Sequence, residues 1–219
     1  MTDVSDDVSL QDVLANAWTE LHHATTTAKH GFHLPTLCTT PIGFDPNRAA
    51  PEARVVVLRS ADAPDADERL RGSVAAHTDT RSPKAEQLRQ HPYAAWVFYD
   101  GPRRLQLRIA GPTELLTFEG ADEQRSVVEE RWNASTLSSR RCYLAPSAPG
   151  SEAQAASPNL PIAFRDKVPK HEAETEPGKA NFAVIRTRVA ALDVLHLHHA
   201  GHRRASFIFN TTGGIERQT

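Results

Sequence analysis

The sequence predicts a mainly β protein of the α+β kind, built as a small antiparallel barrel with added helices. Three observations lead to this fold class. Six or more short segments are rich in β-branched and aromatic residues, residues 104–109 alternate strictly between polar and apolar, and turn residues separate the segments. A chain of 219 residues can bury one substantial core, so we expect a single domain over residues 1–219.

Composition narrows the functional classes. The net charge is −2 and the pI is about 6.6, which argues against bulk binding to nucleic acid or to anionic membranes, although local basic clusters stay open. The two cysteines, Cys38 and Cys142, predict reduced thiols and exclude a Cys-x-x-Cys zinc site. The first residues are acidic and no long apolar run follows, so we expect no signal peptide, no membrane span and a cytoplasmic protein.

The first elements are a helix and an irregular strand. Apolar residues recur at three- and four-residue steps after Ser9, which predicts an amphipathic helix over about 9–29. Gly31 ends it, and residues 32–40 read as a strand that Pro35 marks as an edge or irregular one. Residues 41–52 are rich in turn formers.

Residues 54–59 (Arg-Val-Val-Val-Leu-Arg) predict an unbroken strand. Both of its faces are apolar over four residues, so both must be covered. In a closed barrel one face fills the interior, and the other needs a partner such as a second subunit. A loop is expected over 61–68, followed by an extended segment near 74–78.

A short helix with anion-binding groups at its start follows. Ser82 fits the N-cap position and Pro83 the first helical position, and Pro92 stops the helix after His91. Free N–H groups at a helix start, together with Arg81, Lys84 and a hydroxyl, form a suitable cradle for phosphate. On these residues alone, an ordinary capped surface helix is the simpler interpretation.

The rest of the chain adds strands and one more helix. Residues 94–99 predict a strand, and 104–109 a second one with Gln106 on its polar face, interrupted at Gly111-Pro112 and resumed over 113–118. A helix is expected over 121–132 and a long loop over about 146–180, where Pro, Gly, Ser and acidic residues replace any periodic pattern. The last strands are expected over 181–189, 192–197 and 205–209.

Four segments in this order resemble the pyridoxamine 5′-phosphate oxidase-like proteins, the FMN-binding split barrels. They are Arg54–Arg59 (RVVVLR), His77–Lys84 (HTDTRSPK), Leu105–Gly111 (LQLRIAG) and Gly201–Phe207 (GHRRASF). Each motif is weak alone, and the ordered set of four is specific. The resemblance implies a six-stranded antiparallel split β-barrel with peripheral helices, acting as a homodimer that holds FMN at the subunit interface.

The resemblance also implies roles for single residues. It puts Arg54, Arg81, Ser82 and Lys84 near the FMN phosphate, and Gln106 at the polar edge of the flavin ring. Ser138 and Arg203 would come from the partner subunit, Ser138 to the cofactor and Arg203 to the substrate. The flavin would further be lined by Val55, Val56, Val57, Leu58, Arg59, His77 and Thr78.

This chain departs from the family pattern at several positions. Ser206 stands where an arginine is expected before Phe207, Leu197 where a tryptophan is expected beside the flavin, and Arg59 where the oxidase has lysine. No Tyr-x-x-x-Arg-x-x-x-Ser run occurs around 117–131 to hold pyridoxamine phosphate. A fully made contact from the expected arginine at 206 would contribute about 1.5–3 kcal/mol, so its replacement predicts weaker FMN binding.

Simpler interpretations stay open for several of these residues. Arg54 and Lys84 could be solvated cations at element ends, Gln106 an exposed strand residue, and Arg203 a partner of acidic surface groups. His196 and His198 share a strand face, but no third ligand follows at a recognisable spacing, so no metal is expected.

These considerations give two hypotheses of different class and a third with an empty site. The first is an FMN-dependent oxidoreductase that acts on a small-molecule substrate between two subunits. The second is a carrier on the same scaffold that binds flavin or haem without turnover. The third is a structural or regulatory dimer. No nucleophile elbow, Walker loop or Gly-x-Gly-x-x-Gly pattern supports a hydrolase, an NTPase or a dinucleotide fold.

Overall fold

The structure is a computed structural model, and it describes residues 8–43, 51–64, 72–153, 158–211 and 214–219. The chain forms two compact units. The sheet unit comprises Met1–Ala76, Tyr93–Thr113 and Arg186–Thr219, and the helical unit comprises His77–Pro92 and Glu114–Ile185.

The chain is mainly antiparallel sheet with several helices, as the sequence predicts. Strand order along the main path is β10-β9-β8-β6-β5-β1-β2, while β4 pairs with β3 and β7, and β7 also pairs with β6. The strands are β1 (Thr36–Thr39), β2 (Glu52–Val55), β3 (Ser60–Asp62), β4 (Ser73–Asp79), β5 (Tyr93–Asp100), β6 (Leu105–Thr117), β7 (Phe182–Arg188), β8 (Ala191–His196), β9 (Arg203–Phe209) and β10 (Ile215–Gln218).

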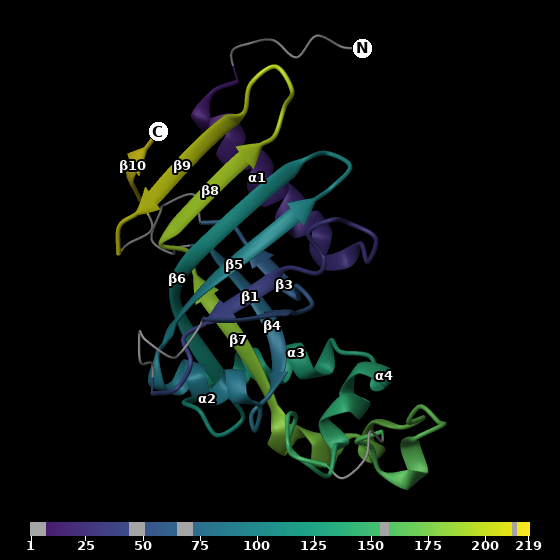
Figure 1. Cartoon of the computed structure of the whole chain (residues 1–219). Helices are drawn as coiled ribbons and strands as arrows, with labels where there is room; N and C mark the ends of the chain where they lie inside the picture. The colour runs from purple at the N-terminus through teal and green to yellow at the C-terminus, as the bar shows by residue number, and fades with distance from the viewer. Residues whose placement is uncertain (1–7, 44–50, 65–71, 154–157, 212–213) are drawn as a thin grey trace. The chain divides into compact units, whose positions relative to one another are not determined.

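Helix α1 (Leu10–Thr26) covers one face of the sheet unit, where it crosses behind β8, β6 and β5 (Figure 1). Ser9 caps it by accepting the Asp12 N–H, and its buried face carries Ala17, Trp18, Leu21 and Ala24. The expected amphipathic helix is confirmed, although it ends at Thr26 and three further residues of the predicted range lie outside it. The inward residues of the strands, including Trp96, Phe98, Leu107 and Ile109, are buried as well.

The prediction of an unbroken strand over 54–59 is wrong. β2 ends at Val55, and residues 56–59 belong to no regular strand. The amides of Val56 and Leu58 donate to the carbonyls of Pro35 and His33, both at 2.9 Å. Because Pro35 has no N–H to return, no two-sided ladder can form there. The chain then pairs with β4 through β3, a strand that falls where a loop was expected over 61–68; residues 65–68 of that loop lie outside the described residues.

The expected interruption at Gly111-Pro112 is also wrong, since β6 runs through both residues. A Cβ at position 111 would collide with the carbonyl oxygen of Arg188, so glycine lets the two backbones approach closely. β8 pairs with β6 only over Leu105–Ala110, so the missing N–H of Pro112 falls beyond that ladder.

The helical unit is built from α2 (Pro83–Gln90), α3 (Asp122–Asn133), α4 (Leu137–Arg140) and the 3-10 turns η1 (Arg141–Leu144), η2 (Ile162–Phe164), η3 (Glu172–Glu174) and η4 (Glu176–Asn181). Helices α2 and α3 confirm the expected ones. Between residues 146 and 180, the described part contains only 3-10 turns and irregular chain. The aromatic core of this unit joins Trp132, Phe182, Tyr143 and Phe118 at ring-centroid distances from 4.9 to 6.4 Å.

Candidate functional site

The start of α2 gathers two hydroxyl groups and an ammonium group. The hydroxyls of Thr78 and Ser82 lie 3.0 Å apart, and the Nζ of Lys84 donates to the Thr78 hydroxyl at 3.2 Å. Thr78 and Ser82 are buried, and Lys84 is half-buried. Ser82 occupies the N-cap position, but its hydroxyl donates to the Asp79 carbonyl at 2.7 Å and caps no helix amide. Hydroxyls, an ammonium and the N-terminus of an eight-residue helix are donors that suit a phosphate group.

Arg81 is already paired at this place. Its guanidinium donates to both carboxylate oxygens of Asp79, at 3.0 and 2.7 Å, and to the carbonyl of Ala145 at 2.9 Å. The hydrogen bonds to Asp79 raise the pKa of Arg81 above its ordinary value. A phosphate held by Arg81 would share the guanidinium with Asp79. The ring of His77 packs edge-on against Phe182, with centroids 4.8 Å apart.

The sheet unit holds the other predicted cofactor residues, on two different faces. Arg54 lies opposite Leu37 in β1 and bonds to the Thr39 hydroxyl and to Glu52, so its side chain is on the inner face. Its neighbour Val55 points outward and is 63% exposed. After β2, Val56 and Leu58 are buried, while Val57 is half-buried and Arg59 exposed. The alternation of buried and more exposed side chains, which is expected of extended chain, therefore continues beyond the end of β2.

The outward face of the sheet unit, called here the outer face, carries Gln106. Register places Gln106 between Tyr99 on β5 and Leu195 on β8. The next row along the strands is Val55, Thr36, Val97, Arg108, Asp193 and Ser206, and the row after it is Cys38, Ala95, Ala110, Ala191, Ile208 and Arg217. The structure thus puts Gln106 and Val55 on one face and Arg54 on the other.

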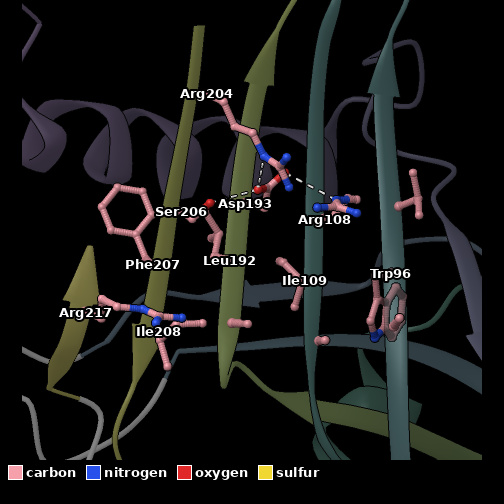
Figure 2. Close-up of a pocket in the computed structure, with 14 residues that line it drawn as sticks. Trp96, Arg108, Ile109, Leu192, Asp193, Arg204, Ser206, Phe207, Ile208 and Arg217 are labelled. Atoms are coloured by element: carbon pink, nitrogen blue, oxygen red, sulfur yellow. Dashed lines mark hydrogen bonds and ion pairs between the residues drawn. The ribbon is translucent and has the colours of Figure 1, made fainter. Parts of the chain in front are cut away.

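A carboxylate holds two arginines together on the outer face (Figure 2). Asp193 accepts hydrogen bonds from the Nε of Arg204 at 2.7 Å, the Nε of Arg108 at 3.2 Å and the hydroxyl of Ser206 at 3.0 Å. Partial burial acts to raise the pKa of Asp193, but the bonds from Arg204, Arg108 and Ser206 outweigh it and lower the pKa. Beside this Asp193 cluster lies a hollow of about 510 Å³.

The two residues expected from a partner subunit lie on different elements. Ser138 is exposed in α4 of the helical unit. Arg203 is exposed at the first position of β9, opposite His196, and lines a second cavity of about 380 Å³ near the start of α1. Arg203 has the opposite parity to Arg204, so it belongs to the other face of the sheet.

Sequence analysis did not find the Asp193 cluster. Asp193, Arg108 and Ser206 become neighbours only through strand register, and Arg204 joins them from the next row. One signal was available. Arg204 and Ser206 alternate with apolar residues in the final strand, which predicts that they share a face.

Comparison with known proteins shows which family the chain is similar to. Residues 15–117 match the sequence profile described as "Pyridoxamine 5'-phosphate oxidase, FMN-binding domain". This part of the chain is similar to the FMN-binding domain of the pyridoxamine 5′-phosphate oxidase family. The pyridoxine/pyridoxamine 5′-phosphate oxidase of Myxococcus xanthus (strain DK1622) is 33% identical over 138 residues, which cover 62% of this chain and 54% of that protein. The chain thus spans about half the length of this curated relative.

Solved structures confirm the fold of this family. A pyridoxamine 5′-phosphate oxidase-related, FMN-binding protein from Nostoc punctiforme is 20% identical, with a TM-score of 0.67, over 100% of this chain and 98% of that one. PhzG from Burkholderia lata, solved with tetrahydrophenazine-1-carboxylic acid, is 14% identical, with a TM-score of 0.59, over 98% of this chain and 93% of that one. In the described part of this chain, no helix has the length and apolar character to span a membrane.

Proposed function

We propose that this protein binds FMN and acts as a homodimeric, FMN-dependent oxidoreductase on a small substrate. The observation that carries the proposal is the match of residues 15–117 to the FMN-binding domain of the pyridoxamine 5′-phosphate oxidase family. Bound FMN would supply the redox step, so the protein's contribution is to bind and orient the cofactor and the substrate.

The residues at the start of α2 fit the phosphate of FMN. Thr78 and Ser82 offer two hydroxyl groups 3.0 Å apart, and the Lys84 ammonium contacts the first of them. A phosphate dianion needs several donors and compensating positive charge, which this set supplies. Arg81 would strengthen the site by its charge while it stays bound to Asp79.

Two exposed side chains on the outer face support a homodimer. Val55 is 63% exposed and Tyr99 50% exposed. Burying such side chains between subunits would remove apolar area from water. This contact would lie on the β2–β5 side of the outer face, whereas the Asp193 cluster lies on its β6–β9 side.

A spectrum of the purified protein tests the proposal. We expect flavin absorbance bands and the release of FMN on denaturation. Anaerobic addition of a substrate or of NAD(P)H should bleach the bands, and air should restore them. Bound flavin that nothing reduces would indicate a carrier, and a colourless protein that takes up no added FMN would refute the proposal.

A further inference from the structure

We propose that the ion pair of Arg81 and Asp79 holds residues 145–151, called here the covering loop, against the start of α2 and thereby controls how fast FMN enters and leaves. The inference rests on the proposed function, because the ligand expected at the start of α2 is the phosphate of FMN. It makes Arg81 a positioning residue, which acts through the covering loop in addition to its charge. The ion pair and the loop belong to the same helical unit.

The two hydroxyl groups at the start of α2 are closed off from solvent. Thr78 is 4% exposed and Ser82 is 1% exposed. A phosphate dianion binds through direct hydrogen bonds, so it has to reach these hydroxyls from outside the protein. A neighbouring part of the chain therefore has to move before a phosphate can enter or leave.

The covering loop contacts the residue on either side of Ser82. On one side, the Nη2 of Arg81 donates to the carbonyl of Ala145 at 2.9 Å. On the other side, Gly150 lies against the ring of Pro83, where a Cβ at position 150 would be 3.4 Å from the Cγ of the proline. Because Ser82 lies between these two contacts, displacement of the covering loop would uncover it.

The contact with Ala145 depends on the way in which Asp79 holds the arginine. The Nε and Nη2 of Arg81 donate to the two carboxylate oxygens of Asp79 at 3.0 and 2.7 Å, which is the bidentate geometry of a strong pair. The Arg81 amide donates to the same carboxylate at 2.8 Å. The guanidinium is thereby fixed, and the second N–H of Nη2 is directed at the Ala145 carbonyl.

The covering loop is also held together by its own hydrogen bonds. Ser151 donates through its amide and its hydroxyl to the carbonyl of Ala148, at 3.2 and 2.7 Å. The side chain of Asn159 accepts from the amide of Ser147 at 3.2 Å and donates to its carbonyl at 2.7 Å. Gly150 has a φ of +83°, a left-handed conformation that favours glycine. The loop therefore keeps its shape while its attachment to α2 opens and closes.

Hydrogen–deuterium exchange of the purified full-length protein tests the attachment. Arg81→Gln and Asp79→Asn each remove one charge from the pair, and the loss of a charge-assisted hydrogen bond favours an open state by about tenfold or more. We expect the buried amide of Ser82 to exchange at least about tenfold faster in both variants. Arg125→Gln and Asp122→Asn, which break an exposed ion pair on α3, are the matched controls and should leave this exchange unchanged.

Stopped-flow fluorescence with FMN tests the control of ligand exchange. If the pair holds the covering loop closed, both variants should bind and release FMN at least about fivefold faster, because each opens the same loop. A role through charge alone predicts opposite effects, since Arg81→Gln removes a positive charge beside the phosphate and Asp79→Asn removes a negative one.

Gly150→Ala tests the second contact of the covering loop without changing a charge. A methyl group at this left-handed position strains the loop beside Pro83, so Gly150→Ala should also speed the release of FMN. Gly43→Ala is its matched control, because Gly43 is also left-handed and a Cβ there would meet no atom within 4 Å. The control should release FMN at the wild-type rate.

The outcomes separate this inference from the proposed function. Opposite effects of Arg81→Gln and Asp79→Asn on FMN release would overturn the role of the covering loop and leave FMN binding standing. Unchanged exchange of the Ser82 amide in both variants would do the same. A wild-type protein that takes up no FMN would refute the proposed function and this inference together.

Discussion

A chain of buried hydrogen bonds inside the sheet unit offers a sharp test of its packing. The indole Nε1–H of Trp96 donates to the Thr187 hydroxyl at 2.8 Å. That hydroxyl lies 2.8 Å from the Thr113 hydroxyl, which donates to the Gly111 carbonyl at 3.2 Å. Trp96 and Thr187 are fully buried, and Thr113 is buried, so no water can replace a lost partner. The hydroxyl of Thr187 therefore satisfies the indole N–H.

The substitution Thr187→Val keeps the shape and removes that hydroxyl. It leaves the buried indole N–H without an acceptor and the Thr113 oxygen without a donor. Since an unsatisfied buried donor costs about 1–3 kcal/mol, we expect the free energy of unfolding to fall by about 2 kcal/mol. Urea denaturation followed by circular dichroism measures this loss, provided that the m-value is unchanged.

A double-mutant cycle isolates the cause of the loss. In a Trp96→Phe background there is no indole N–H to leave unpaired, so Thr187→Val should cost at least about 1 kcal/mol less than in the wild type. If Thr187→Val costs the same free energy in both backgrounds, the hydrogen bond to Trp96 does not stabilise the fold and the reasoning is refuted.

Three further predictions follow from the described contacts. Arg140→Ala should lower the free energy of unfolding by about 3 kcal/mol, because the buried guanidinium donates to the carbonyls of Trp132, Asn133 and Ser135. The control Arg125→Ala should lower it by less than about 0.5 kcal/mol, and equal losses for the two variants in denaturant titrations would contradict this prediction. Gly111→Ala should cost about 3 kcal/mol or more through the collision with the Arg188 carbonyl, whereas Gly101→Ala, which meets no close atom, should be nearly neutral in a thermal melt. Partial burial acts to raise the pKa of Glu20, but hydrogen bonds from Arg103 and His30 lower the pKa overall. The ionised Glu20 therefore stabilises the fold above the ordinary glutamate pKa, and this stabilisation is lost as the pH falls through the lowered pKa. When unfolding is measured at decreasing pH, Glu20→Gln should lose less stability on the acid side than the wild type does, and identical curves would be evidence against the ion pair.

Local patterns in the sequence predicted much of the fold. The N-cap position of Ser9 and Ser82, the period of α1 and the alternation of residues 104–109 all depend on residues close in sequence, and each was confirmed, although the Ser82 hydroxyl caps no helix amide. The predictions that proved wrong concern places where contacts with a distant segment determine the local structure. Pro35 lies opposite Val56 and has no N–H to complete the pairing there, and glycine at position 111 leaves room for the carbonyl of the distant Arg188, so that β6 continues through it.

In the candidate site, too, the features that could be predicted depend on residues close in sequence, and those that depend on distant segments could not. The donors at the start of α2 could be predicted because they lie within a few residues of one another along the chain. The pairing of Arg81 with Asp79, two residues earlier in the chain, was not predicted. The Asp193 cluster needed the register of β6, β8 and β9, which composition and periodicity do not supply.

The most direct test compares FMN with riboflavin, which lacks the phosphate. Quenching of flavin fluorescence gives the Kd of each ligand for the wild type and for Lys84→Gln, with Lys179→Gln, a lysine of η4 paired with Glu176, as the control. If the α2 start holds the phosphate, the wild type and the control should prefer FMN by at least about tenfold, and Lys84→Gln should lose most of that preference. Equal affinity of the wild type for both ligands, or a preference that survives Lys84→Gln unchanged, would contradict the account.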